Sequence, residues 1–182
     1  MSIALGLIEF KTVPIGIFAT DEMIKAAEIN IIFTAPTCPG KYITIVSGEV
    51  AEVESSVKRG VDAGGSFYID SSVIPNIDDS IIPALTGTVN VPDIKAIGVI
   101  ETIAAVSSIT IADIVAKAAS VELLEIRLAR GLGGKGEIFY TGELGAVEAA
   151  NRAALSMAEK GGGIVSSTVI ARPSPALIEA IA

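Results

Sequence analysis

Apolar and polar residues follow two patterns along the chain, one typical of strands and one typical of helices. Short apolar runs rich in Ile and Val, bounded by Gly, Pro or Asp, predict strands. Longer segments with apolar residues three and four positions apart predict helices, as where Val50, Val53 and Val57 share one face. The elements predicted for the first half are a strand at 3–10, a helix at 16–28, strands at 29–33 and 42–46, a helix at 49–64, a strand at 66–73 and an apolar tail at 77–85.

The second half of the chain repeats this order. The elements predicted for it are strands at 96–103, 121–129, 137–141 and 163–170, helices at 108–120 and 143–160, and a tail from residue 175 onward. The order β-α-β-β-α-β favours an antiparallel sheet with both helices on one face, as in the ferredoxin-like arrangement. We therefore expect an α/β (α+β) chain built from two such domains.

Repeated sequence words support a tandem duplication. Ala4-Leu5-Gly6-Leu7-Ile8-Glu9 returns as Ala96-Ile97-Gly98-Val99-Ile100-Glu101, at an offset of 96 − 4 = 92. Gly40-Lys41 returns as Gly134-Lys135, at an offset of 134 − 40 = 94. The growing offset indicates small insertions in the second copy, and two copies make a duplicated domain rather than a solenoid. We predict domains at 1–90 and 91–182.

The composition is apolar but poor in aromatic residues. Hydrophobic residues make up 51% of the 182 residues and aromatic residues only 4%, with a mean hydropathy of +0.63. This surplus of small aliphatic side chains predicts that part of the apolar surface is buried between subunits. No run is long enough to predict a membrane-spanning helix, and the first ten residues do not resemble a secretion signal.

Charge and residue usage exclude several functions. The formal net charge is −8 and there is no cluster of Lys or Arg, which argues against nucleic-acid binding. The chain has no histidine, which removes Ser-His-Asp and Cys-His catalysis and histidine metal ligands. A single cysteine allows no disulfide within the chain, so a cytoplasmic location is expected.

That single cysteine, Cys38, lies between Pro36 and Pro39 and is followed by Gly40. Apolar runs on both sides predict that it sits at the tip of a tight turn between two strands. From the residues alone, a free cysteine is more often a small buried hydrophobe than a ligand. A lone thiol on a rigid turn becomes useful when symmetry brings several copies together.

The equivalent turn of the second copy is Arg130-Gly131-Leu132-Gly133-Gly134-Lys135-Gly136. A phosphate-binding loop is one interpretation, but no Ser or Thr follows the lysine and no helix follows the loop. A tight turn that lines an opening or packs beside an axis is the simpler interpretation. Glu9 and Glu101 recur at strand ends, and we interpret them as structural.

The duplicated unit resembles the bacterial microcompartment shell proteins. The resemblance covers nearly the whole chain. It rests on the short motifs Gly6-Leu7-Ile8-Glu9, residues 21–27, Gly40-Lys41, Gly48-Glu49 and their counterparts in the second copy. Two such domains are similar to the tandem-domain, trimeric class. The turn Thr37-Cys38-Pro39-Gly40-Lys41 is similar to that of the PduT type, from the propanediol-utilisation shell.

The resemblance implies a homotrimer that forms a pseudo-hexameric tile. In that family the first-domain turns converge on the three-fold axis, and their cysteines hold a [4Fe–4S] cluster, so Cys38 is the implied metal ligand. The implied pore-lining residues are Thr37, Pro39, Gly40 and Lys41, with the second-domain turn Leu132, Gly133, Gly134 and Lys135 beside them. Lys41 and the backbone N–H groups of Cys38 and Gly40 would then tune the cluster.

The resemblance also implies roles at the tile edge. Lys25 and Lys117, each four residues after an Asp, match the family's edge lysine, and Arg172 with Pro173 matches its edge Arg-Pro pair. The first copy carries Asn76-Ile77 at the place of that pair. Without the family, each Asp–Lys pair is an ordinary i,i+4 ion pair on a helix. The implied partners are other shell proteins, edge to edge, and a lumenal or cytosolic redox enzyme.

Three functions follow from these features. The first is a shell tile whose pore holds the cluster, for electron transfer or cluster exchange. The second is a metabolite-selective pore tile without a cluster. The third, an enzyme with Cys38 as nucleophile, lacks a base to activate the thiol, and we expect no enzymatic activity.

Overall fold

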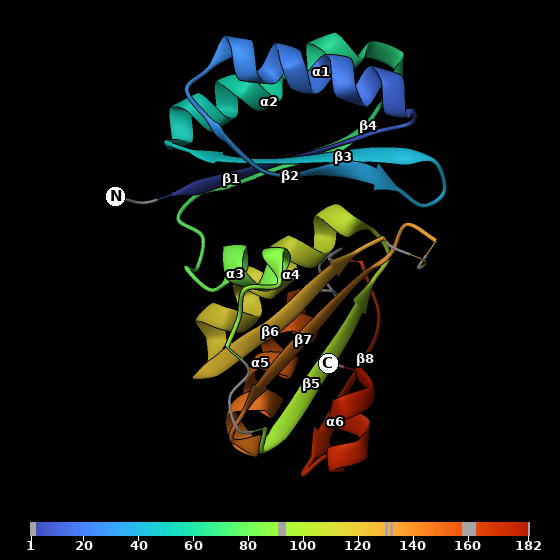
Figure 1. Cartoon of the computed structure of the whole chain (residues 1–182). Helices are drawn as coiled ribbons and strands as arrows, with labels where there is room; N and C mark the ends of the chain where they lie inside the picture. The colour runs from blue at the N-terminus through green and yellow to red at the C-terminus, as the bar shows by residue number, and fades with distance from the viewer. Residues whose placement is uncertain (1–2, 91–93, 130, 132, 158–162, 182) are drawn as a thin grey trace. The chain divides into compact units, whose positions relative to one another are not determined.

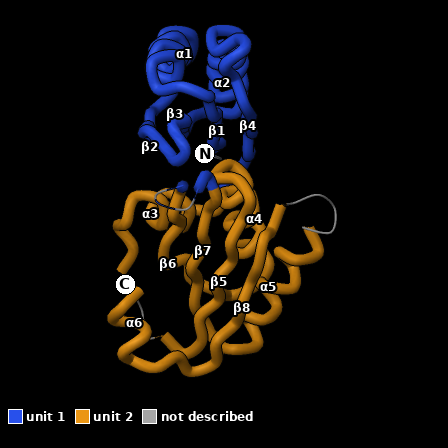
Figure 2. Tube along the Cα trace, turned by 90° about the vertical axis from the view of Figure 1, so that its right-hand side faces the viewer, with its two compact units in different colours: residues 1–77, 129–134 blue, residues 78–128, 135–182 orange. Residues whose placement is uncertain are grey.

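The computed structural model describes residues 3–90, 94–129, 131, 133–157 and 163–181. Contacts within the chain define two compact units (Figures 1 and 2). Unit 1 comprises Met1–Ile77 with Ala129–Gly134, and unit 2 comprises Asp78–Leu128 with Lys135–Ala182. In the described part of the chain, no helix is long and apolar enough to span a membrane.

Unit 1 is a four-stranded antiparallel sheet with two helices on one face (Figure 1). The strand order β2-β3-β1-β4 confirms the ferredoxin-like arrangement predicted from the sequence. Its elements are β1 (Ala4–Phe10), α1 (Val13–Ala26), β2 (Asn30–Thr37), β3 (Lys41–Gly48), α2 (Val50–Gly64), a short 3-10 helix (Gly65–Phe67) and β4 (Tyr68–Ile74).

Unit 2 has the same topology, with the strand order β6-β7-β5-β8. Helices α4 and α5 pack against each other and against its sheet. Its elements are α3 (Ile81–Thr86), β5 (Ala96–Thr102), α4 (Ala105–Ala118), β6 (Val121–Leu128), β7 (Gly136–Gly142), α5 (Leu144–Met157), β8 (Ile164–Ala171) and α6 (Pro175–Ile181).

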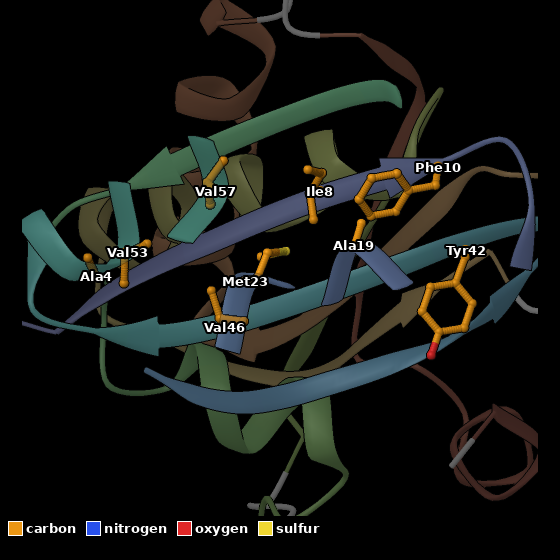
Figure 3. Close-up of a cluster of buried hydrophobic side chains, with 9 residues drawn as sticks. All are labelled: Ala4, Ile8, Phe10, Ala19, Met23, Tyr42, Val46, Val53 and Val57. Atoms are coloured by element: carbon orange, nitrogen blue, oxygen red, sulfur yellow. The ribbon is translucent and has the colours of Figure 1, made fainter. Parts of the chain in front are cut away.

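The core of unit 1 lies between the sheet and its two helices. Every residue of the central strand β1 is buried, which explains its nearly continuous apolar sequence. Ile8 and Phe10 of this strand pack with Met23 of α1 and Val53 of α2 (Figure 3). A Cβ atom on Gly6 would lie 2.6 Å from Val57 Cγ2, so α2 approaches β1 at a place that only glycine leaves open.

The observed elements differ from the predicted ones at their ends, most of all at β2, which extends to Thr37 instead of residue 33. Helix α1 begins at Val13 instead of residue 16, because Pro14 fits the first turn, where no backbone N–H is needed. Helix α4 likewise begins at Ala105 instead of residue 108. The predicted end of the helix at 143–160 lies outside the described residues. The tail predicted at 77–85 contains α3, and contacts assign this helix to unit 2.

Candidate functional site

The turn between β2 and β3 carries Cys38 at its tip. Thr37 and Lys41 form the last pair of the hairpin, which leaves Cys38, Pro39 and Gly40 as the turn itself. The Cys38–Pro39 peptide bond is cis. Gly40 has a φ of 80°, a left-handed conformation that favours glycine, and an added Cβ would meet nothing within 4 Å. The predicted position of Cys38 in a tight turn is therefore confirmed.

The thiol of Cys38 is free and exposed. Its backbone N–H donates to the carbonyl oxygen of Ala129, at 3.4 Å within unit 1. This hydrogen bond occupies the backbone N–H group of Cys38, which we expect from the resemblance to tune the cluster. Beside it, Thr37 is buried, and among the described residues its hydroxyl oxygen has no hydrogen-bond partner.

The second-domain turn packs beside the Cys38 turn. A Cβ atom on Gly134 would lie 3.2 Å from the carbonyl oxygen of Cys38 and 3.7 Å from Lys41 Nζ. Gly133 and Gly134 have φ values of 64° and 94°, which favour glycine. Leu132, predicted in the same turn, lies outside the described residues. The structure thus brings Gly134 and Cys38 together, a closeness that the resemblance implies and that their separation in the sequence alone does not reveal.

Each turn lysine is paired with a glutamate of the central strand. Lys41 Nζ lies 3.3 Å from Glu9 Oε2, and Lys135 Nζ lies 2.6 Å from Glu101 Oε1. Glu9 is 1% exposed and its Oε1 has no hydrogen-bond partner among the described residues. Burial raises the pKa of Glu9, whereas the hydrogen bond from Lys135 lowers the pKa of Glu101.

Sequence reasoning missed these two pairs. The interpretation of Glu9 and Glu101 as structural assigns them no lysine partner, and the resemblance assigns Lys41 to the cluster. The signal was available, because both the glutamates and the lysines recur between the copies. A recurring Glu and a recurring Lys indicate a contact only after the strand pairing places them side by side.

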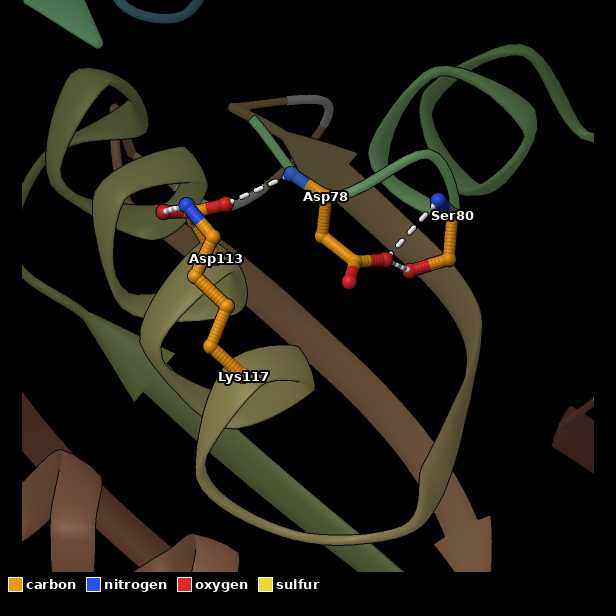
Figure 4. Close-up of polar contacts among 4 residues, drawn as sticks. All are labelled: Asp78, Ser80, Asp113 and Lys117. Carbon is orange, nitrogen blue, oxygen red and sulfur yellow. Dashed lines mark hydrogen bonds and ion pairs between the residues drawn. The ribbon is translucent and has the colours of Figure 1, made fainter. Parts of the chain in front are cut away.

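The residues predicted at the tile edge lie on helices and at a strand end. Lys25 pairs with Asp21, and Lys117 Nζ lies 2.6 Å from Asp113 Oδ2, so both predicted i,i+4 ion pairs form. Asp113 Oδ1 also accepts the backbone N–H of Asp78 at 2.8 Å (Figure 4). Their placement at a tile edge stays a prediction.

Arg172 follows β8 and is exposed, with a φ of 49°. Asn76 follows β4 at the equivalent place and has a φ of 52°. Both copies therefore leave the last strand through a left-handed residue, which asparagine adopts more easily than arginine. The contact of Arg172 with a neighbouring tile stays a prediction.

The described residues of one chain contain no group of three or more His, Cys, Asp or Glu side chains placed to hold a metal ion. Iron–sulfur clusters are held by cysteine thiolates, usually four. Since one chain offers a single thiol, a cluster at Cys38 requires thiols from other copies. The exposure of the thiol at a turn tip is compatible with such sharing.

Comparison with known proteins identifies the family. A family model described as the BMC domain matches residues 4–77 and 96–173. The chain is 34% identical to the bacterial microcompartment shell protein PduT of Citrobacter freundii, over 95% of this chain and 94% of that protein. It is 40% identical to the carboxysome shell protein CcmK2 of a Synechocystis strain, over 35% of this chain and 61% of that protein.

Solved structures agree with this assignment. A microcompartment protein from Desulfitobacterium hafniense superimposes with a TM-score of 0.93 at 36% identity, covering 97% of this chain and 98% of that one. The fused, permuted hexameric shell protein MSM0275 has a TM-score of 0.64 at 21% identity, over 88% of this chain and 86% of that one, and shows the fold alone. The chain belongs to the BMC-domain family of bacterial microcompartment shell proteins and carries two copies of the domain in tandem.

Proposed function

We propose that three copies of this chain form a pseudo-hexameric shell tile whose three Cys38 turns meet at the three-fold axis. The three thiolates hold a [4Fe–4S] cluster in the central pore, for electron transfer or cluster exchange across the shell. Family membership supports the tile. Relatives named as shell proteins also support a structural rather than an enzymatic role.

The observation that carries the cluster is the exposure of the only thiol of the chain at the tip of a strand turn. A three-fold axis would bring three such thiols together, and water or another small ligand would serve as the fourth ligand of the cluster. When bound, the cluster supplies one-electron chemistry. Pro39 and Gly40 shape the turn that presents the thiol, and Gly134 allows the neighbouring turn to pack against it.

The pair of Glu9 and Lys41 tunes the charge beside this turn. Burial already favours the protonated form of Glu9 by raising its pKa. Negative charge gathered at three thiolates favours that form further. Lys41, which follows the turn and lies 3.3 Å from Glu9 Oε2, would place a positive charge near the anionic site.

The test is to measure iron and acid-labile sulfide after anaerobic purification, for the natural protein and for Cys38→Ser. We expect about four of each per trimer in the natural protein and none in the variant. Because Cys38 is exposed, the variant should keep the trimer, which sedimentation velocity checks.

Stoichiometric iron retained by the variant would show that Cys38 is not the ligand. A trimer that contains no iron even after reconstitution would instead support a metabolite-selective pore without a cluster. A monomer would contradict the tile itself.

A further inference from the structure

We propose that unit 2 carries a binding site for a small uncharged molecule with an apolar body and one hydroxyl group, such as a simple alcohol or phenol. The site is a cavity of about 240 Å³ between the sheet and α6. The residues that line it include neither the Cys38 turn nor the residues predicted at the tile edge. This inference therefore goes beyond the proposed function and does not depend on it.

The cavity lies on the face of the sheet opposite α4 and α5. Tyr140 of β7 faces the helices, because its ring covers Gly98 and its hydroxyl donates to Asn151 of α5. The preceding residue, Phe139, points to the other face, since side chains alternate along a strand. Phe139 lines the cavity together with residues of α6. The sheet thus forms one wall of the cavity and α6 forms another.

The walls of the cavity are mostly apolar. Apolar side chains line it from the sheet, from α6 and from the segment before β5, among them Ile97, Phe139, Ile178, Ile181 and Val89. Protein interiors are packed as densely as organic crystals, so an unfilled space of this size costs stability. An engineered apolar cavity of about 150 Å³ stays dry and binds benzene, so a molecule of about seven to ten non-hydrogen atoms fits here.

Among the described residues that line the cavity, Glu125 has the one polar side chain. Its Oε2 lies 2.7 Å from Arg127 Nη2. The same nitrogen donates to the carbonyl oxygen of Ile181 at 2.7 Å, and Arg127 Cζ lies 4.6 Å from the centre of the Phe139 ring. Arg127 thus holds the carboxylate in place at the end of α6. A carboxylate accepts several hydrogen bonds, so Glu125 suits a hydroxyl donor and repels an anionic ligand.

The duplication shows that these groups belong to unit 2 alone. Strand pairing matches three residues of the site with three apolar residues of unit 1, which are Phe33 for Glu125, Ala35 for Arg127 and Ile45 for Phe139. Unit 1 forms the same four-stranded sheet without the carboxylate, the guanidinium or the ring. The fold itself therefore does not require them. An apolar cavity with one oriented polar group is the usual form of a small-molecule site.

Three related probes test the chemical class, with the full chain in solution. The probe p-cresol carries a hydroxyl on an apolar ring, toluene lacks the hydroxyl, and p-toluate carries a carboxylate in its place. We expect calorimetric titration to show one p-cresol bound per chain and no binding of p-toluate. Toluene should bind at least about tenfold more weakly, because it cannot hydrogen-bond to the carboxylate. Amide hydrogen exchange of α6 should slow when p-cresol binds, while that of α5 stays unchanged.

Two substitutions test the position of the site. Val89→Phe places a larger side chain in the cavity from outside the helices and strands, and should abolish p-cresol binding. Glu125→Gln keeps the size of the side chain and supplies an amide donor, so this variant should bind p-toluate. Leu155→Phe, at a residue of α5 that is 39% exposed, is the matched control and should bind p-cresol like the natural protein.

Binding of p-cresol that Val89→Phe leaves unchanged would place the site elsewhere and overturn the inference. Ile178→Phe enters the same cavity from α6 and repeats this test if circular dichroism shows that Val89→Phe is misfolded. No binding by the natural protein, as when a neighbouring chain fills the cavity, would also overturn it. Cys38→Ser should bind p-cresol normally, so failure of the cluster and failure of this site are distinguishable.

Discussion

At the scale of single residues, two equivalent glutamates illustrate how burial changes chemistry. Glu9 is buried and 3.3 Å from its lysine, whereas Glu101 is more exposed and 2.6 Å from its own. Desolvation dominates for Glu9 and raises its pKa above 4.5, while the lysine hydrogen bond dominates for Glu101 and lowers its pKa below 4.5. The duplication thus provides a matched pair inside one chain.

This pair predicts opposite pH dependences. A raised folded pKa stabilises the fold below pH 4.5, and this contribution is lost as the pH rises through the folded pKa. Relative to Glu9→Gln, the natural protein should therefore lose stability as the pH rises from about 4 to 7. Urea unfolding of both proteins at several pH values measures this difference.

Glu101→Gln is the control with the opposite sign. The lowered pKa of Glu101 stabilises the fold above pH 4.5, and this contribution is lost as the pH falls through the folded pKa. The natural protein should therefore lose stability relative to Glu101→Gln at acidic pH. Differences of the same sign for both variants would contradict the assignment of the two shifts.

At the scale of elements, the same helix-on-sheet packing is achieved with different side chains. In unit 1 the space above Gly6 is filled by Val53 and Val57 of α2. In unit 2 the ring of Tyr140 covers Gly98, and its hydroxyl donates to Asn151 of α5 at 3.2 Å. The two units therefore share the same strand order and helix packing but differ in the side chains that fill their cores.

Gly98→Ala should strongly destabilise unit 2. The added Cβ would lie 2.2 Å from Tyr140 Cζ, and the ring is held by its hydrogen bond to Asn151. Overpacking of this kind costs about 1–3 kcal/mol of unfolding free energy. Gly145→Ala in the first turn of α5, where an added Cβ meets nothing within 4 Å, should not destabilise the protein and should raise its stability by less than about 1 kcal/mol. Equal effects in chemical denaturation would contradict this packing.

The sequence predicted the elements well because periodicity and repetition carry that information. The duplication and the sheet with helices on one face could be predicted from the spacing of apolar residues. The start of α1 at Val13 differs from the predicted start at residue 16, and the structure places Pro14 in the first turn, where proline is tolerated. Assignment of α3 to unit 2 depends on contacts far apart in the chain, which periodicity does not encode.

At the scale of the whole molecule, the candidate site was only partly predictable. The turn that carries Cys38 could be predicted from the sequence, because the prolines and the glycine that shape it are its immediate neighbours in the chain. The contact of the Cys38 N–H with Ala129 and the closeness of Gly134 join residues about ninety positions apart. Such contacts depend on how distant parts of the chain fold together, which the local sequence pattern does not encode.

Native mass spectrometry of anaerobically purified protein tests the central claim most directly, because it measures subunits and cofactor together. We predict one species with the mass of three chains plus one [4Fe–4S] cluster, and for Cys38→Ser a species of three chains alone. A monomer, or a natural trimer that carries no iron and sulfide after reconstitution, would contradict the account of a tile whose three Cys38 thiolates hold a cluster.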